Sequence, residues 1–249
     1  MAFSYNNIGM VYAEQGTSLL TPLQKRREFL NKALENYFAS LKIKEEIGDK
    51  KGMGTSYNNI GIVYGEQATS APDAPIGTGL RPLSRNSAGQ ATRRELLDKA
   101  LEKHFASLKI YEEIGDKQGI AVSYNNIGTI YRKQATSPPD APIGTGLTLL
   151  KKRGELLDRA LENYFASLKI GEEIGDKQSI STCYIDIANI YMDQFNYAEA
   201  IAWFQKGLRL AKEIGAKQLL LEAYKGLSAV NEKTNDYRNA YKYHQLYSQ

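Results

Sequence analysis

The sequence has few of the residues that build metal centres and nucleophilic active sites. It contains one cysteine, Cys183, and two histidines, His104 and His244. A lone cysteine forms no disulfide within the chain, and a zinc site of cysteine and histidine would lack ligands. A Ser-His or Cys-His pair would need one of the two histidines, and no pair of carboxylates recurs in a pocket-like pattern. The sequence therefore predicts a protein that is not an enzyme and binds no metal or cofactor.

Long hydrophobic runs are absent too, because no stretch of about eighteen apolar residues occurs. Residues 1–7 have neither the basic nor the apolar region of a signal peptide. We therefore expect no membrane segment, and a soluble, cytoplasmic protein if the chain is complete as given. With 42% hydrophobic and 24% charged residues the chain can bury a core, and its net charge of +4 is too small to indicate a nucleic-acid partner.

What the sequence does contain is an internal repeat. Residues 4–9 read SYNNIG, and the same six letters return at 56–61 and 123–128, and more loosely at 183–188. In each copy a Tyr, an Ile, a Gly or Ala, and a second Tyr fall at positions i, i+3, i+4 and i+7. This is the spacing of the buried stripe of an amphipathic helix, which we call helix A. The spacing predicts that these tyrosines pack in the core and do not stack on nucleic-acid bases.

A second motif, which we call helix B, follows helix A in each repeat. It reads ALENYFASLKI at residues 33–43 and is nearly repeated at 100–110 and 160–170, with an echo at 200–210. The first tyrosines of helix A, which lie at positions 5, 57, 124, 184 and 224, are 52, 67, 60 and 40 residues apart. All of this variation falls between helix A and helix B, as insertions of 12, 27 and 20 residues on a unit of 40.

The turn from helix B to the next helix A has a clear chemical signature. Gly48-Asp49 recurs as Gly115-Asp116 and Gly175-Asp176, while Gly215-Ala216 lacks the aspartate. Glycine takes the left-handed conformation that often ends a helix, and aspartate is a favourable N-cap for the next one. The pattern therefore predicts a helix stop and a capped helix start at each of the first three turns.

Neither helix of a pair can bury its apolar stripe alone, so the sequence predicts an all-α solenoid of stacked antiparallel helix pairs, with long insertions in the A-to-B turns of repeats 1–3. We expect a single solenoid over residues 1–249. Its repeats are assigned to 1–48, 49–115, 116–175 and 176–215, with a degenerate fifth repeat at 216–249. The inserts are placed at about 16–27, 68–94 and 135–153.

The pattern Tyr-x-x-Ile-Gly-x-x-Tyr of helix A and the pattern Ala-x-x-x-Phe-x-x-x-Leu of helix B resemble the tetratricopeptide repeat. The period of 40 residues and the paired asparagines are similar to the subtype of kinesin light chains and Partner-of-Inscuteable proteins. The resemblance implies a right-handed superhelix that binds a protein or an extended peptide and does no chemistry. Residues 236–247 are also similar to the end of tetratricopeptide input regions in Bacteroidetes sensor kinases and cyclases. The alternative is therefore a sensory input region of a histidine kinase or nucleotide cyclase, of which this chain would be a fragment.

In such a superhelix, helix A lines the concave groove, and the two residues after its first tyrosine face the ligand. These residues are Asn6 and Asn7, Asn58 and Asn59, Asn125 and Asn126, and Asp186 in repeat 4. An amide both donates and accepts, so a ladder of asparagines can bind the backbone of an extended peptide. The resemblance gives this role to Asn7, Asn59 and Asn126, and we expect Met10, Ile62, Thr129, Arg132 and Asn189 to set the side-chain preference. The alternative is that these asparagines only bond neighbouring helices or water.

Three basic clusters occupy equivalent positions just before helix B: Lys25-Arg26-Arg27, Arg93-Arg94 and Lys151-Lys152-Arg153. Cations near a helix N-terminus oppose the helix dipole, so we expect that helix stability is not their purpose. They form either a possible anion patch of Arg26, Arg27, Arg93, Arg94, Lys152 and Arg153 or a surface copied by duplication. The inserts of repeats 2 and 3 share residues 67–80 and 134–147, which differ only in Ala71 against Pro138, and we expect their PDAPIGTG loops to touch. Gly77-Thr78-Gly79 lacks the Gly-Lys-Ser/Thr of a phosphate-binding loop.

Overall fold

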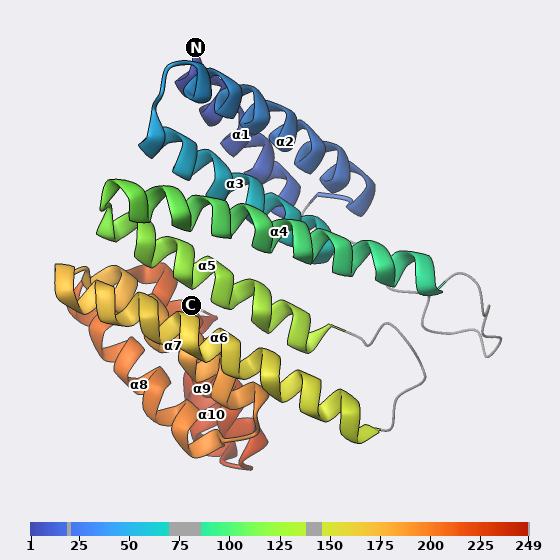
Figure 1. The fold of residues 1–249 in the computed structure, drawn as a ribbon. Helices are drawn as coiled ribbons and strands as arrows, with labels where there is room; N and C mark the ends of the chain where they lie inside the picture. Colours follow the sequence, from blue (N-terminus) through green and yellow to red (C-terminus); the bar gives the residue numbers. More distant parts are fainter. Residues whose placement is uncertain (19–20, 70–85, 138–145, 249) are drawn as a thin grey trace. The chain divides into compact units, whose positions relative to one another are not determined.

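The computed structural model of the chain describes residues 1–18, 21–69, 86–137 and 146–248, and over these residues it contains helices and no strands (Figure 1). The prediction of an all-α fold is therefore confirmed. The helices are α1 (Ala2–Thr17), α2 (Leu23–Glu46), α3 (Lys50–Thr69), α4 (Asn86–Ile114), α5 (Lys117–Thr136), α6 (Gly146–Ile174), α7 (Lys177–Asp193), α8 (Tyr197–Glu213), α9 (Lys217–Lys233) and α10 (Tyr237–Tyr247). The odd-numbered helices are helix A of repeats 1–5, and the even-numbered helices are helix B.

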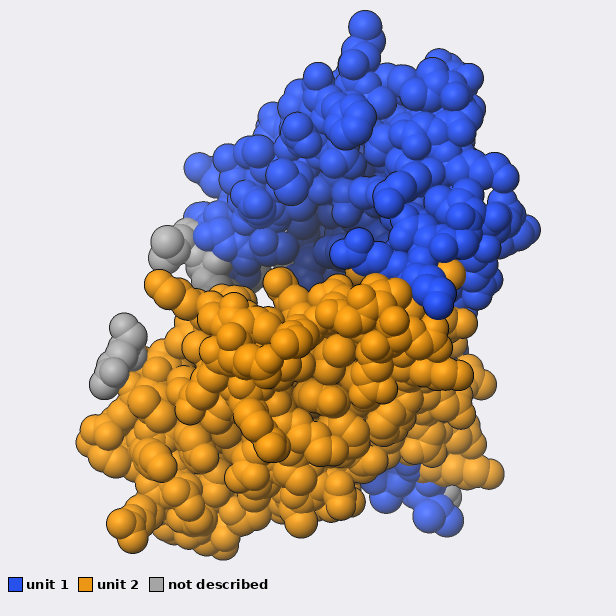
Figure 2. Space-filling model, turned by 90° about the vertical axis from the view of Figure 1, so that its left-hand side faces the viewer, with its two compact units in different colours: residues 1–119, 137–150 blue, residues 120–136, 151–249 orange. Residues whose placement is uncertain are grey.

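The chain forms two compact units (Figure 2). Unit 1 consists of residues 1–119 and 137–150, and unit 2 consists of residues 120–136 and 151–249. In unit 1, α2 packs on both α1 and α3, and α3 packs on α4; in unit 2, α8 packs on both α7 and α9, and α9 packs on α10. Each of these helices thus packs on its neighbours along the chain, as in an α-solenoid, and the helices A also meet directly, α1 with α3 and α7 with α9.

Each helix pair of repeats 1–3 closes around one ring of helix B that lies over a glycine of helix A. The rings are those of Tyr37, His104 and Tyr164, all at most 3% exposed. A Cβ atom added at Gly9, Gly61 or Gly128 would lie within 2.8, 2.6 and 2.9 Å of these rings, respectively. Such approaches are closer than ordinary packing permits, so glycine is required at these points of helix A.

The helix A tyrosines lie at the edges of these cores. Tyr57 and Tyr64 pack against the core of repeats 1 and 2, and Tyr131, Tyr184 and Tyr191 pack against the core around Tyr164. The predicted packing role is thus confirmed for these five tyrosines, which are half-buried, whereas Tyr5 is 37% exposed. The most deeply buried rings come from helix B.

The turns between repeats have the predicted conformation. Gly48, Gly115, Gly175 and Gly215 have φ angles of +70, +67, +71 and +68°, in the left-handed region. The carboxylate of Asp116 accepts a hydrogen bond from the backbone N–H of Gly119 at 3.0 Å. Asp176 accepts from the backbone of Gln178 and Ser179. At α9 the N-cap is Ala216, which makes no side-chain bond.

The missing cap of α9 can be restored. Asp176 has φ −79° and ψ 86°, and Ala216 has φ −79° and ψ 87°, so an aspartate fits the backbone at Ala216 without change. We expect Ala216→Asp to raise the free energy of unfolding by about 1 kcal/mol and Asp176→Ala to lower it by about as much. Urea unfolding followed by circular dichroism measures both. If Ala216→Asp is neutral while Asp176→Ala destabilises, the explanation from capping is wrong.

The glycine under each ring gives a second prediction. Gly128→Ala places a Cβ 2.9 Å from Tyr164 and 3.1 Å from the backbone oxygen of Ala160. We expect it to lower the free energy of unfolding by about 1–3 kcal/mol. The matched control is Gly154→Ala in α6, where a Cβ meets no atom within 4 Å. Because alanine favours the helix, this variant should gain about 0.5–1 kcal/mol. Equal effects in the two variants would contradict the packing argument.

Candidate functional site

In unit 1 the candidate residues lie on the helices α1 and α3. Asn7 is exposed, and Met10 and Ile62 are 48% and 44% exposed. Asn6 and Asn59 are half-buried, and the side-chain Nδ2 of Asn59 donates to Oδ1 of Asn6 at 3.3 Å. The amides of these two helices are therefore joined to each other, while Asn7, Met10 and Ile62 reach solvent.

Asn58 does not lie on this surface. It is 5% exposed, and its Oδ1 lies 3.0 Å from the ring nitrogen Nδ1 of His104. Because the amide oxygen only accepts, this contact requires a proton on Nδ1. The finding corrects the expectation that Asn58 faces a ligand, since its side chain is directed at helix B of its own repeat.

In unit 2 the equivalent pair is Asn125 of α5 and Asp186 of α7. Nδ2 of Asn125 donates to Oδ2 of Asp186 at 2.9 Å. The two pairs occupy equivalent positions. The first member directly follows the first tyrosine of one helix A, and the second member lies two positions after the first tyrosine of the next helix A. For these two pairs the structure shows the alternative considered above, a bond between neighbouring helices. Asn126, Thr129 and Asn189 are half-buried.

Asp186 carries the most perturbed carboxyl group of this surface. Burial raises its pKa from the ordinary 3.8 to about 6, and Glu222 of α9 adds to the rise, while the bond from Asn125 and the charge of Arg132 oppose it. Only Oδ2 accepts a side-chain bond among the described residues. In that same part of the chain no side-chain oxygen or nitrogen is both buried and unbonded. By its exposed surface, the Asp186 side chain is half-buried.

Arg132 is held by an ion pair. Its Nε lies 2.6 Å from Oδ2 of Asp193, which joins α5 to the C-terminal end of α7. Both side chains are largely covered, at 31% and 16% exposure. Arg132 therefore holds the Asp193 side chain in place, and the charge of Arg132 is balanced by that carboxylate.

The basic clusters have a structural role that the sequence analysis missed. Arg26 donates from Nε to the backbone oxygen of Thr21 at 2.7 Å, and Arg93 donates to that of Ala68, near the end of α3, at 3.1 Å. Arg153 donates to the backbone oxygen of Asp193, the last residue of α7, at 3.0 Å, and its guanidinium covers the ring of Phe195. A cation at the C-terminal end of a helix is stabilising.

This corrects the expectation that helix stability is not the purpose of these arginines. Arg93 of α4 stabilises α3, and Arg153 of α6 stabilises α7. Arg27, Arg94 and Lys152 are exposed, and the anion patch stays a prediction for them. The repeated loops at residues 72–79 and 139–146, whose contact was predicted, lie outside the described residues except for Gly146.

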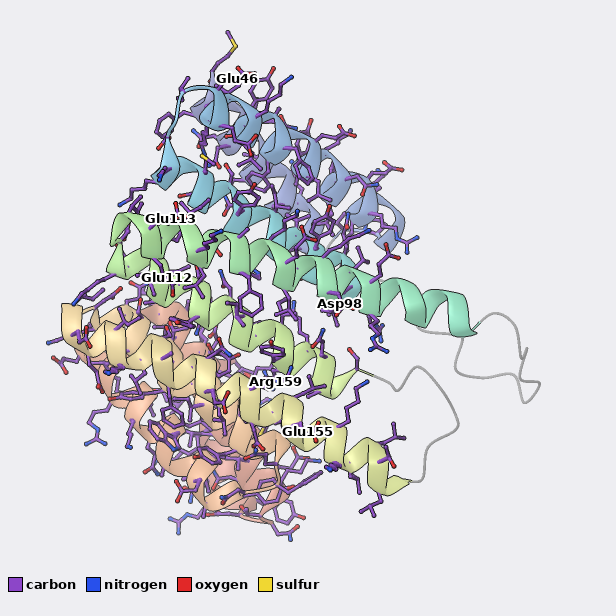
Figure 3. The ribbon with its side chains drawn as sticks, viewed as in Figure 1. Glu46, Asp98, Glu112, Glu113, Glu155 and Arg159 are labelled. Carbon is purple, nitrogen blue, oxygen red and sulfur yellow. The ribbon has the colours of Figure 1, made fainter. Side chains whose placement is uncertain are left out.

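The remaining charged and nucleophilic groups show no arrangement for chemistry in the described residues. Lys50 pairs with Glu113 of α4, labelled in Figure 3, at 3.2 Å, and Lys177 pairs with Glu213 at 2.6 Å. Such exposed pairs contribute little. Burial raises the pKa of the Cys183 thiol to about 11, so the sulfur is not a thiolate. In the same residues no group of three or more potential metal ligands was found, and no helix is long and apolar enough to cross a membrane.

The comparisons with known proteins agree with this architecture. Residues 179–247, which span α7 to α10, match the tetratricopeptide repeat family. These residues are therefore similar to tetratricopeptide repeats. No curated protein matches the chain. The crystal structure of BtubC (BKLC) from P. vanneervenii is similar at 14% identity and a TM-score of 0.50, covering 99% of this chain and 88% of that one. It supports the helical-repeat fold alone.

A second similar structure is the apo form of RapI, at 14% identity and a TM-score of 0.40, covering 99% of this chain and 96% of that one. At this score the likeness carries no argument. The resemblance to the kinesin light chain subtype has no support in these comparisons, so it stays an expectation.

The raised pKa of Asp186 gives a third prediction. A carboxyl group with a raised pKa in the folded state stabilises the fold fully below its unfolded pKa, and this contribution is lost as the pH rises through about 6. Asp186→Asn removes the cost of the charge and allows an amide pair like that of Asn6 and Asn59. We expect the variant to be more stable than the wild type at pH 7 by about 1 kcal/mol, a figure reduced because the side chain is only half-buried.

Urea unfolding at several pH values measures the difference in free energy of unfolding between the variant and the wild type. This difference should become smaller as the pH is lowered from about 6 to about 4. The control is Glu222→Gln, which removes a neighbouring charge and should move the same transition to lower pH without abolishing it. A difference between wild type and Asp186→Asn that does not change with pH would show that Asp186 titrates normally.

Proposed function

We propose that the chain is a non-catalytic scaffold for protein–protein interaction that binds an extended peptide or partner segment along its helix A surfaces. The observation that carries the proposal is the outward row of Asn7, Met10 and Ile62 on α1 and α3. It combines an exposed amide with two apolar side chains that are 48% and 44% exposed. Exposed apolar side chains beside a group that both donates and accepts suit the backbone and side chains of an extended peptide.

The rigidity of this surface supports the same role. The bond between Asn6 and Asn59 fixes α1 against α3, and the bond between Asn125 and Asp186 fixes α5 against α7. Residues next to these bonds are therefore held in place before a ligand arrives, which lowers the entropic cost of binding. In this account the bonded amides position the surface, and the outward residues contact the ligand.

The surface of unit 2 differs from that of unit 1 in its charge. Asp186 stands where repeats 2 and 3 have Asn59 and Asn126, and its Oδ2 accepts a hydrogen bond from Asn125. A ligand cation or N–H donor placed against this carboxyl group would favour the ionised carboxylate. Unit 2 therefore suits a partner segment with a basic or amide group at this point.

The alternative function is a sensory input region of a larger signalling protein. It rests on the likeness of residues 236–247 to such regions, and no contact in the described residues favours it. Helical-repeat folds of this class generally serve binding and not catalysis, which agrees with the proposal.

Selection of peptide ligands tests the proposal. A phage-displayed library of random linear peptides is selected on the wild-type chain, and the Kd of a labelled selected peptide is measured by fluorescence anisotropy. We expect Ile62→Lys to weaken binding by about tenfold or more, because it replaces an apolar contact with a hydrated charge.

The matched control is Phe105→Lys. Phe105 is 45% exposed, close to the 44% of Ile62, but lies on the helix B layer of the same unit. Its substitution should leave the Kd unchanged. Recovery of no peptide, or an equal loss in both variants, would count against a ligand on the helix A surface.

A further inference from the structure

The side of α1 that faces away from α2 and α3 is apolar and exposed. Ile8 and Val11 are 44% and 50% exposed. Their equivalents in α3 and α7 are at most 1% exposed: Ile60, Val63, Ile187 and Ile190. Helix B of the preceding repeat buries these equivalents, as α2 buries Ile60 and Val63 against Leu30 and Ala33. At α1 the exposure of Ile8 and Val11 shows that no helix of the described residues buries them in this way.

This face of α1 has the same residues as the surface of α3 that α2 covers. Six positions of α3 contact α2 or the core that it shares with α3, namely Met53, Ser56, Tyr57, Ile60, Val63 and Tyr64. The equivalent six positions, five in α1 and one at its N-cap Met1, hold the same six residue types, namely Met1, Ser4, Tyr5, Ile8, Val11 and Tyr12. Of these, Tyr12 also stacks on Phe29 of α2. A surface with the same residues at the same helical spacing fits the same partner, which is a helix B.

The complementary surface is exposed on α10, the helix B of the fifth repeat. Tyr237 and Tyr241 are 64% and 65% exposed. Tyr237 stands at the position of Leu30 in α2 and Leu157 in α6, which are 0% and 2% exposed because the next helix A covers them. Tyr241 stands at the position of Leu34, which packs against the same core as Ile60. The chain thus exposes the two halves of one repeat-to-repeat interface.

The charges of the two faces are compatible. The only charged side chain of α1 is that of Glu14, whereas α10 carries Arg238 and Lys242 and no carboxylate. Junctions within the units also contain a recurring polar bond, in which Gln67 donates to Asn31 and Gln194 donates to Asp158. At the exposed faces the equivalent positions hold Gln15 and Arg238, and a guanidinium can donate to the glutamine oxygen.

We propose that the chain associates head to tail, with α10 of one copy packed on α1 of a second copy in the manner of α2 on α3. Tyr237 and Tyr241 of the first copy then cover Ile8 and Val11 of the second. The two surfaces are different, so the contact is heterologous, and each added copy leaves one free α1 and one free α10. Association should therefore rise with concentration and need not stop at a dimer.

Sedimentation velocity over a wide range of concentration tests the proposal with the full chain. Ile8→Lys blocks one surface and Tyr241→Lys blocks the other, and each should weaken self-association by about ten- to a hundredfold. The matched control is Ile62→Lys, which changes an equally exposed isoleucine on α3 outside both faces and should leave association intact. Since Ile62→Lys is also the variant expected to weaken peptide binding, the two proposals can fail independently.

Mixing the two blocked variants gives the sharpest result. Ile8→Lys keeps an intact α10 and Tyr241→Lys keeps an intact α1, so an equimolar mixture should form a complex of one copy of each and stop there. Circular dichroism verifies that each variant is folded. If either variant is not, Val11→Lys or Tyr237→Lys replaces it, because these residues belong to the same two faces.

Three results would overturn the proposal. The first is a wild-type chain that stays monomeric at every concentration. The second is an association that only one of the two blocking variants weakens, as expected for a symmetric contact of α1 with α1. The third is a mixture of the two folded variants that forms no complex.

Discussion

The close approach of helix A to helix B within each pair is the constraint on which the rest of the structure depends. A ring of helix B lies over glycine in helix A, and a serine of helix B hydrogen-bonds to a helix A carbonyl nearby. These bonds join Ser40 to Ala2, Ser107 to Gly54 and Ser167 to Ala121, at 3.0, 2.8 and 2.8 Å. In repeat 4 the residues are exchanged, because helix B has Gly207 at the serine position and Ser181 of helix A donates to its backbone oxygen at 3.0 Å. Repeat 4 thus has a serine bond at the same place, but helix A supplies the donor in place of helix B. The feature common to all four repeats is the short distance between the two helices.

This close approach also decides which polar residues of helix A are available to a ligand. Because the glycine packs within its own pair and the isoleucine packs on helix B of the preceding repeat, the residues after the first tyrosine lie where adjacent helices A meet. Two amides there are close enough to bond each other, as Asn6 and Asn59 do, and an aspartate can replace one of them, as Asp186 does opposite Asn125. The polar residues after the first tyrosine therefore bond neighbouring repeats to each other. Contacts with a ligand are left to side chains that extend beyond them, such as Met10 and Ile62. Removing a bonded amide is expected to affect stability as well as binding, because it leaves its partner with one bond fewer.

The sequence predicts the parts of this architecture that depend on local pattern. Helical spacing indicates the buried stripes, and Gly-Asp pairs indicate the turns, since both signals depend on residues a few positions apart.

Contacts between distant parts of the sequence cannot be predicted in this way. Nothing near Asn58 in the sequence indicates that its partner is His104, 46 positions away, and nothing near Arg153 indicates the carbonyl of Asp193. The perturbed pKa of Asp186 has the same origin, because it results from burial between three helices that only the fold brings together. The signal that could have indicated these contacts is the equivalence of positions between repeats, since Arg26, Arg93 and Arg153 occupy one position and each bonds a backbone oxygen.

The exposed faces of α1 and α10 differ in polarity. Where helix B of repeat 1 has Leu30 and Leu34, α10 has Tyr237 and Tyr241, so each leucine is replaced by a side chain that carries a hydroxyl. An exposed face that carries polar groups has favourable contacts with water. The outer face of α1 shows no comparable change and keeps Ile8 and Val11. Burial of these two side chains gains more free energy per unit area than burial of the hydroxyl-bearing face of α10. Any helix that packs at the N-terminal end of the array is therefore held mainly by the isoleucine and valine of α1, whereas α10 contributes orientation through its tyrosine hydroxyls and its two cations.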